Sequence, residues 1–377
     1  MPGDGHARLR VAHVRDTYLR ATETFIYDIV TRHRTVEPLF LCERVRGDAH
    51  FPGVSPRAIE TLGAATRAVN AVSRRVRHAF PFYTGECRRF GARLIHAHFA
   101  PSGYFLLATR RALGIPLVTS FYGQDVFEVP ATPRWRGRYA RLFAEGDLFL
   151  ALSEDMKKDL VAIGCPASKI RIYRLGIDLH DFSPIDRPVR ETVTILTIAR
   201  LVEKKGIDVL IRAHARLVAK GLPVRLRVVG DGPLMDSLVA LARELGVADR
   251  VDFAGRVPFA ELPAEFAAAD VFSLPSVTDR YGGKDEISMV LKEAMGTALP
   301  FVATFHAGIP EVIDDGVNGL LVPERDDARL ADALERLAVD PLLRARIGAE
   351  GRRLVERVWE IGRQVEVLEN IYHELAG

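Results

Sequence analysis

The sequence is poor in cysteine and has no long apolar segment. Its 377 residues include only three cysteines, Cys42, Cys87 and Cys165, which are far apart and odd in number. This pattern favours neither a disulfide framework nor a metal site, and it makes the reducing cytoplasm the expected location. No run approaches the roughly 18 consecutive apolar residues that identify a membrane-spanning helix. Residues 1–6 also lack the basic-then-apolar plan of a signal peptide.

The chain does have enough apolar material for two cores, and its charge is unevenly distributed. Of its residues, 48% are hydrophobic. Residues 1–180 hold 27 Lys and Arg against 17 Asp and Glu, whereas residues 181–377 hold 25 against 32. This difference in net charge is either chance variation between two protein surfaces or an indication that the basic N-terminal half binds an anionic partner. Nucleic acid is disfavoured because no recognition motif is present, which leaves a phosphorylated lipid or an anionic membrane surface.

Short apolar strands alternate with helical patterns in two halves of the sequence. In the first half, strands are expected at 8–14, 38–41, 94–99, 116–120 and 148–152. After a turn-rich break at 178–188, strands are expected at 193–198, 224–229, 251–253, 271–274 and 301–303. Covered parallel sheets have this rhythm. The sequence therefore predicts two α/β domains, with ligand-binding residues in the loops after the strands.

The most informative segment runs from Asp285 to Glu293. Its two carboxylates, eight residues apart, flank the backbone amides of Ile287, Ser288 and Met289, where a helix is expected to begin. Amides at a helix N-terminus, together with the positive end of the helix dipole, favour an anionic or hydroxyl-rich ligand. Glu293, one to two turns into the helix, is well placed to hold two neighbouring hydroxyls such as those of a ribose. The pattern predicts a nucleotide-sugar pocket.

This segment resembles the acid-x7-acid motif of retaining glycosyltransferases of family 4, and residues 296–304 and 307–311 continue the resemblance. The chain departs from the motif at Asp285, where the family usually has Glu, and at Glu286, where it usually has Gly. The backbone amides that follow are unaffected by either change.

The resemblance implies an α/β architecture of the GT-B type, in which two Rossmann-like domains face a central cleft. Residues 1–180 would form the acceptor-binding domain, and residues 181–357 the nucleotide-sugar-binding domain. Residues 358–377 would form a helix that returns to the N-terminal domain.

Arg200 and Lys205 follow the predicted strand at 193–198 and match the family's Arg-x4-Lys-Gly signature. Two fixed cations lower the barrier to departure of a nucleotide diphosphate without a metal ion. The alternative is a solvated helix start with ordinary basic residues, although the helix dipole disfavours cations there. Lys204 is expected to face solvent.

Gly230 and Gly232 match the Gly-x-Gly-Pro turn that lies near the nucleotide in this family. A tight turn before a proline-started helix would explain the two glycines equally well.

Two segments of the first half resemble the branch of the family that makes bacterial exopolysaccharides. Thr22, Glu23 and Thr24 open a predicted helix whose amides could bind a phosphate of the acceptor, although Thr22 could also be a simple N-cap. His96 and His98 share one face of a strand. Of these two, His98 is the better candidate for contact with an acceptor and His96 for a packed core residue.

A third segment, residues 121–125, resembles the family's Phe-His-Gly-x-Asp sequence. Tyr122 stands where the family commonly has the histidine that approaches the donor sugar, and a tyrosine hydroxyl can donate to a sugar oxygen. Asp125 is expected near the reaction centre or the acceptor, with a helix cap as the alternative.

Residues 64–80 have the pattern of a basic amphipathic helix. Apolar residues recur at helical spacing at Val69, Val72, Val76 and Phe80, and four arginines lie largely off this stripe: Arg67, Arg74, Arg75 and Arg77. The helix either packs its stripe over the sheet or docks on a membrane or lipid phosphate.

Taken together, the resemblance implies a retaining, metal-independent glycosyltransferase that uses a UDP- or GDP-sugar as co-substrate and needs no cofactor. Catalytic roles would fall to Arg200, Lys205, Asp285 and Asp125. The expected acceptor is a lipid-linked saccharide of surface polysaccharide synthesis, and the expected place is the inner face of the cytoplasmic membrane. Three alternatives remain: a transferase for a soluble small molecule such as an aminocyclitol, a nucleotide-sugar epimerase, and a catalytically silent GT-B binding subunit.

Overall fold

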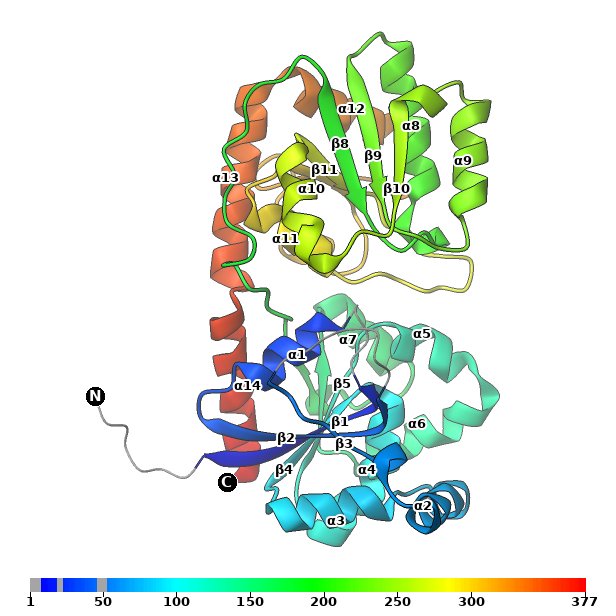
Figure 1. Cartoon of the computed structure of the whole chain (residues 1–377), viewed down its shortest axis with the longest axis vertical. Coiled ribbons are helices and arrows are strands. Elements are labelled where there is room, and N and C mark those ends of the chain that lie inside the picture. The colour runs from blue at the N-terminus through cyan, green and yellow to red at the C-terminus, as the bar shows by residue number, and fades with distance from the viewer. Residues whose placement is uncertain (1–7, 19–22, 46–52) are drawn as a thin grey trace, which may run out of the picture. The chain divides into compact units, whose positions relative to one another are not determined.

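The computed structural model describes residues 8–18, 23–45 and 53–377 and shows two α/β units, each built on one sheet (Figure 1). The N-terminal unit comprises the chain up to Gly176 together with Ile361–Gly377, and the C-terminal unit comprises Ile177–Glu360. The boundaries expected from the sequence were at residues 180 and 357. The prediction of two Rossmann-like α/β domains is confirmed.

The sheet of the N-terminal unit has seven strands in the order β3-β2-β1-β4-β5-β6-β7. These are β1 Leu9–Tyr18, β2 Val36–Val45, β3 Arg57–Ala58, β4 Leu94–His98, β5 Leu117–Ser120, β6 Leu148–Ala151 and β7 Ile170–Ile172. All neighbouring strands are parallel. Every residue of β4, β5 and β6 is buried, because helices lie on both sides of the sheet.

Eight helices of the described residues belong to this unit: α1 Thr24–Thr31, α2 Ala64–Val76, α3 Pro81–Phe90, α4 Ala100–Leu113, α5 Gln124–Ala131, α6 Pro133–Glu145, α7 Glu154–Ala162 and α14 Ile361–Ala376. The last of these is far from the others in sequence. It contacts α1 and β4, and it buries Val365, Leu368 and Tyr372 on one face. An amphipathic stripe at helical spacing therefore returns the end of the chain to the N-terminal core.

The sheet of the C-terminal unit has six strands in the order β10-β9-β8-β11-β12-β13. These are β8 Val193–Ile198, β9 Val224–Val229, β10 Val251–Gly255, β11 Val271–Leu274, β12 Phe301–Thr304 and β13 Leu320–Val322. All pairs are parallel. This is the Rossmann order, and it reverses direction between β8 and β11. Ligands of such sheets bind outside the carboxyl ends of the strands at this switch point.

The helices of the C-terminal unit are α8 Ile207–Ala219, α9 Met235–Glu244, α10 Leu262–Ala268, α11 Met289–Gly296, α12 Asp327–Val339 and α13 Pro341–Val358. They enclose a single apolar core together with the strands. Across the described part of the chain, no helix combines the length and the apolar character needed to span a bilayer.

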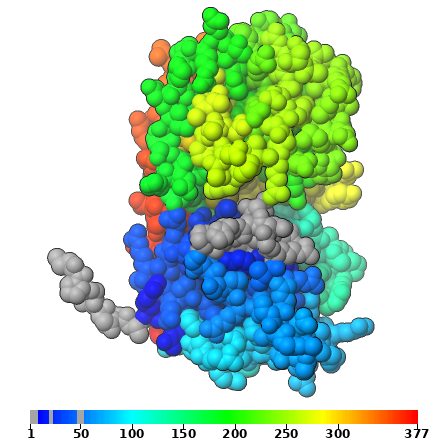
Figure 2. All heavy atoms as spheres, in the orientation of Figure 1, coloured from blue at the N-terminus to red at the C-terminus, as the bar shows by residue number. Residues whose placement is uncertain are grey.

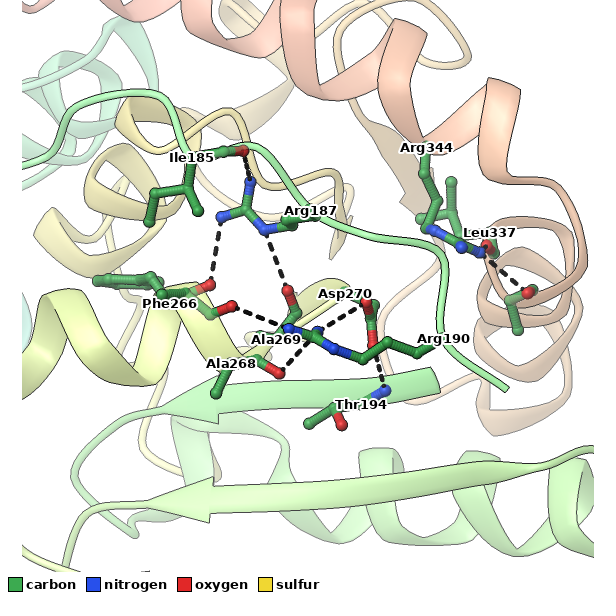
Figure 3. Close-up of polar contacts among 12 residues, drawn as sticks. Ile185, Arg187, Arg190, Thr194, Phe266, Ala268, Ala269, Asp270, Leu337 and Arg344 are labelled. Atoms are coloured by element: carbon green, nitrogen blue, oxygen red, sulfur yellow. Dashed lines mark hydrogen bonds and ion pairs between the residues drawn. The ribbon is translucent and has the colours of Figure 1, made fainter. Parts of the chain in front are cut away.

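Two arginines fix the segment that leads into β8 (Figure 3). Arg187 donates to the carbonyl oxygen of Ala269 over 3.0 Å, and burial lowers the pKa of its guanidinium to about 10. Arg190 donates to one carboxylate oxygen of Asp270 over 3.0 Å, and the other oxygen accepts the N–H of Thr194 over 2.8 Å. These contacts tie β8 to the start of β11, the two strands that flank the switch point.

Candidate functional site

An ion pair joins the loops that follow the two strands at the switch point of the C-terminal unit. Lys205 follows β8 and Asp285 follows β11, and the distance from Lys205 Nζ to Asp285 Oδ2 is 2.5 Å. Both side chains are largely enclosed, with 13% and 16% of their surfaces exposed. Ser276 Oγ lies 3.5 Å from the same carboxylate oxygen. Two residues that the sequence placed in one site are therefore in direct contact.

Asp285 is ionised in this arrangement. Burial alone would raise the pKa of its carboxyl, but the charges of Lys205 and Lys204 and the hydrogen bond from Lys205 outweigh burial and lower it below its ordinary value. Lys204, which was expected to face solvent, is half-buried, and its Nζ lies 3.4 Å from the carbonyl oxygen of Lys284. That expectation was wrong, because the loop that carries Asp285 folds over Lys204.

A histidine and a glutamate hold the Asp285 loop in place. The backbone N–H of Asp285 donates to His306 Nε2 over 2.9 Å, and His306 Nδ1 donates to Glu324 over 2.6 Å. Glu324 also accepts the N–H of Thr278 over 2.8 Å. Burial opposes ionisation of Glu324, yet the Thr278 amide and His306 keep its pKa below the ordinary value. Because Nε2 accepts, the proton of neutral His306 is fixed on Nδ1.

Sequence reasoning missed His306 and Glu324. The signal was present in their positions, since His306 lies two residues after β12 and Glu324 two residues after β13. The carboxyl ends of parallel strands meet at one edge of the sheet, so both residues reach the edge that Lys205 and Asp285 occupy.

Arg200 is exposed and forms no ion pair within the described ranges. The two cations of the predicted signature therefore differ: Lys205 is held by Asp285, whereas the guanidinium of Arg200 is available to a ligand. An unpaired guanidinium can bind a phosphate through two parallel hydrogen bonds.

The helix predicted after Asp285 is confirmed. Helix α11 begins at Met289 with Ser288 as its N-cap residue, and the N–H groups of a first helical turn have no partner within the helix. Ser288 Oγ is buried without a hydrogen-bond partner in the part of the chain that the structure describes. Glu293 lies in the second turn and is 5% exposed. The ligand contacts of these residues and of Ile287 stay predictions.

Gly230 and Gly232 pack directly against the loop after β8. A Cβ atom at Gly230, where φ is +133°, would lie 1.8 Å from the carbonyl oxygen of Ala199. A Cβ atom at Gly232 would lie 2.5 Å from the carbonyl oxygen of Leu201. Close backbone approach is thus sufficient to require glycine at both positions, and contact with a nucleotide stays a prediction.

In the N-terminal unit, Asp125 ties two loops together. One carboxylate oxygen accepts the N–H of Ala100 over 3.0 Å, at the start of α4, and the other accepts the N–H of Tyr122 over 2.9 Å. Burial raises the pKa of the Asp125 carboxyl to about 6, although these backbone hydrogen bonds act in the opposite direction. The capping alternative raised by the sequence describes this geometry, and the catalytic role of Asp125 stays a prediction.

Beneath Tyr122 lies a continuous chain of buried side chains. Tyr122 Oη is 2.7 Å from His98 Nδ1, His98 Nε2 is 3.2 Å from His13 Nδ1, and His13 Nε2 is 3.2 Å from His33 Nε2. His33 Nδ1 is 3.2 Å from the carboxylate of Glu369 on α14. Burial raises the Glu369 pKa, but hydrogen bonds from His33 and from residues 34 and 35 lower it to about 2. An anionic Glu369 makes every ring donate toward it, so the Tyr122 hydroxyl donates to His98.

His96 and His98 share a face as predicted, with ring centroids 4.3 Å apart. The expected difference in their exposure is absent, because both rings are fully buried. His96 bonds to Tyr372 over 2.5 Å and to Ser120 over 2.7 Å. The nitrogens of His96, His98 and His13 lie within 4.8 Å of one another, close enough to hold a metal ion. Each of these nitrogens, however, already has a hydrogen-bond partner.

The N-terminal acceptor segment is only partly visible. Thr22 lies outside the described residues. Helix α1 begins at Thr24 with Glu23 as its N-cap residue, whose side chain does not cap the helix. Glu23 is buried and accepts a hydrogen bond from Arg15 over 3.0 Å, and the Arg15 guanidinium lies 4.0 Å from the centre of the Phe99 ring. Acceptor binding by this segment stays a prediction.

Comparison with known proteins places both units in one group of enzymes. The family described as "Glycosyltransferase Family 4" matches residues 23–181, and the family described as "Glycosyl transferases group 1" matches residues 192–340. Together these matches cover most of both units.

Individual relatives agree with the family matches. The chain is 39% identical over 251 residues to a putative colanic acid biosynthesis glycosyltransferase, WcaL, of Escherichia coli; the match covers 65% of this chain and 61% of WcaL, less than two thirds of that protein's length. It is 31% identical over 266 residues to a GDP-mannose-dependent phosphatidylinositol monomannoside mannosyltransferase of Mycolicibacterium smegmatis, covering 67% of this chain and 68% of the relative. The crystal structure of Anabaena HepE in complex with UDP shares the fold, with a TM-score of 0.76, 18% identity, and coverage of 97% of this chain and 100% of HepE.

Proposed function

Since the chain belongs to glycosyltransferase family 4, we propose that it transfers a sugar from a nucleotide diphosphate donor to an acceptor hydroxyl. The observation that carries this proposal is the enclosed Lys205–Asp285 ion pair, together with the exposed Arg200 on the same loop after β8 as Lys205. Both features lie at the switch point of a Rossmann sheet, where ligands of such sheets bind.

The two cations would stabilise the departing diphosphate. Arg200 would bind the phosphates without first breaking an ion pair, because no carboxylate of the described ranges pairs with it. A phosphate near Lys205 competes with Asp285 for its ammonium group, and the released carboxylate can accept a hydrogen bond from a hydroxyl of the sugar. Glu293 would hold the ribose. Fixed cations aimed at developing phosphate charge are a large catalytic term, which supports a metal-independent reaction.

The proposed reaction retains the configuration of the sugar. The bond between the anomeric carbon and the diphosphate oxygen breaks, and the acceptor oxygen bonds to the same face of the carbon. The acceptor proton passes to the departing phosphate. No carboxylate of the site is assigned as a nucleophile, and Asp285 is assigned to a hydroxyl of the sugar instead.

Donor and acceptor are proposed from the relatives. HepE was solved with UDP, and the mycobacterial relative is named for GDP-mannose, so we propose a UDP- or GDP-sugar as donor. WcaL is named for colanic acid biosynthesis, which supports a lipid-linked saccharide of surface polysaccharide synthesis as acceptor. The enzyme would then work on the inner face of the cytoplasmic membrane.

A panel of UDP- and GDP-sugars tests the proposal. The purified protein should bind at least one of them in calorimetry and release its nucleotide diphosphate slowly by hydrolysis. Activity should persist in EDTA, and the first product seen by NMR should keep the anomeric configuration of the donor. Failure to bind any nucleotide sugar would exclude the proposed function. An inverted product or loss of activity in EDTA would exclude the corresponding part of the mechanism.

A further inference from the structure

Helix α2 exposes its apolar stripe. Val69, Val72 and Val76 are 57%, 62% and 71% exposed, and Asn70 is the one buried residue of the helix. The helix is shorter than the predicted 64–80, because α2 ends at Val76. Phe80, the fourth residue of the predicted stripe, is the N-cap residue of α3 and is buried in the core. The alternative in which the stripe packs over the sheet is therefore wrong for the three valines. Figure 2 shows the azure spheres of this region at the surface of the N-terminal unit. An exposed row of valines at helical spacing indicates a surface that binds an apolar partner outside the chain.

The opposite face of α2 borders a pocket of about 450 Å³. Helix α2 contributes Arg74 and Arg75 to it, α6 contributes Arg134 and Arg138, and Trp135 and Phe105 supply aromatic surface. Four guanidinium groups thus converge on one cavity. Such a set has the geometry to bind phosphate oxygens through several charge-assisted hydrogen bonds.

The charge of this cluster is largely uncompensated. Arg74 pairs with Glu43 over 2.9 Å, whereas Arg75, Arg134 and Arg138 form no ion pair within the part of the chain that the structure describes. The guanidinium of Arg138 lies 4.8 Å from the centre of the Trp135 ring. Burial, and then the like charges of Arg134 and Arg74, lower the pKa of Arg138.

We propose that α2 and this arginine pocket form a docking site for the surface of an anionic phospholipid bilayer, with a lipid phosphate in the pocket. A helix lying in the plane of the interface buries its apolar face about 5–10 Å into the boundary between headgroups and acyl chains. The valines then lie among the acyl chains, and the arginines on the opposite face lie at the depth of the phosphates. This inference rests on the proposed function in one respect: docking would bring the enzyme to a membrane-borne acceptor.

Vesicle co-sedimentation without any nucleotide sugar tests the site. The protein should bind vesicles of phosphatidylcholine mixed with phosphatidylglycerol, ignore pure phosphatidylcholine, and dissociate as salt rises. Arg134→Gln combined with Arg138→Gln should weaken binding about thirtyfold, because each basic residue near an anionic surface contributes about fivefold. The matched control, Arg88→Gln with Arg171→Gln, removes the same charge from exposed positions of the same unit and should change binding much less.

A second arm separates the apolar ridge from the charge. Val72→Gln with Val76→Gln, which removes the apolar surface without changing the charge, should abolish vesicle binding while circular dichroism and donor binding stay unchanged, since these side chains are exposed. Equal binding by the two arginine pairs, or by the valine variant, would overturn the proposal. So would tight binding of soluble glycerol 3-phosphate with no affinity for vesicles. Normal donor binding in a protein that ignores vesicles would remove this inference and leave the proposed function intact.

Discussion

At the scale of single residues, the C-terminal unit has one ion-paired cation and one unpaired cation in the loop after β8. Lys205 is bound to Asp285, and Arg200 is exposed. We expect Arg200→Ala and Lys205→Ala each to lower turnover at least about a hundredfold, because each removes a fixed charge that stabilises the leaving diphosphate. Steady-state kinetics on the accepted donor measures this. Lys220→Ala, an exposed lysine of the same unit that pairs with Glu335, is the control and should keep full activity.

Asp285 pairs with Lys205 and is proposed to bind a hydroxyl of the donor sugar. Two substitutions of Asp285 should therefore have different effects. Asp285→Glu keeps the charge but lengthens the side chain, so we expect a changed preference among donor sugars with activity retained. Asp285→Ala leaves Lys205 without its carboxylate and should impair every donor. The ratio of kcat/KM values over a donor panel distinguishes the two. An alanine variant with the wild-type kcat/KM for every accepted donor would remove Asp285 from sugar recognition.

The buried histidines of the N-terminal unit predict how its stability depends on pH. Burial, followed by the charges of neighbouring histidines, lowers the pKa values of His13 and His98, and lowers that of His96 to about 3. Their stabilising contribution is complete above the unfolded pKa of about 6.5 and is lost as pH falls. Each histidine should cost about 1.4 kcal/mol per pH unit below that value. Hydrogen-exchange protection of β4 between about pH 7 and pH 5 measures the loss, and constant protection would contradict it.

Single residues also show where sequence reasoning ends. The resemblance to family 4 indicated Lys205 and Asp285 separately, but their direct pairing depends on how far two loops fold toward each other. His306 carries no motif, and its role follows only from the neighbouring position of β12 in the sheet. For Asp125 the sequence left two roles open, and the hydrogen bonds that support the cap come from backbone groups 3 and 25 residues away.

At the scale of elements, the central strands were predictable because they are continuous apolar runs. The bounds of β8, β9 and β11 agree with those expected, and those of β4, β5 and β6 differ by one residue at most at either end. The strands β1 and β2 are longer than expected, because polar residues continue them beyond the apolar runs at 8–14 and 38–41. The strands β3, β7 and β13 were missed, since two or three residues at the margin of a sheet carry too little pattern. For α2 the predicted helix exists but ends at Val76 instead of residue 80, so Phe80 is not part of its stripe. Periodicity alone also does not state which neighbour covers a stripe. The exposed valines settle that question.

One carboxylate of helix α14 accepts hydrogen bonds from several donors of the segment before β2. Glu369 accepts the N–H groups of Arg34 and Thr35 over 2.7 and 3.0 Å, and the Thr35 hydroxyl over 2.9 Å. Glu369→Gln removes an acceptor and should destabilise the unit by about 1–3 kcal/mol, because buried donors lose their partner. Chemical unfolding measures this. Glu366→Gln, an exposed position on the same helix, should change the free energy of unfolding little, and equal effects would contradict the assignment.

At the scale of the whole molecule, the proposed function assigns one of the two substrates to each unit. The C-terminal unit holds the ion pair, the exposed arginine and the start of α11, which suit a nucleotide diphosphate sugar. The excess positive charge lies in residues 1–180, since residues 181–377 have more acidic than basic residues. The N-terminal unit also holds the arginine pocket and the exposed stripe of α2. The charge split seen in the sequence therefore has a structural location, and it is consistent with a soluble donor and a membrane-borne acceptor.

One measurement tests this account most directly: the transfer of radiolabelled sugar from the accepted nucleotide sugar to lipid extracted from membranes. The wild-type protein should place the label in a solvent-extractable lipid product, and Arg200→Ala should lower this rate at least about a hundredfold. A label that appears only in water-soluble products, or an Arg200→Ala variant as fast as the wild type, would contradict the account.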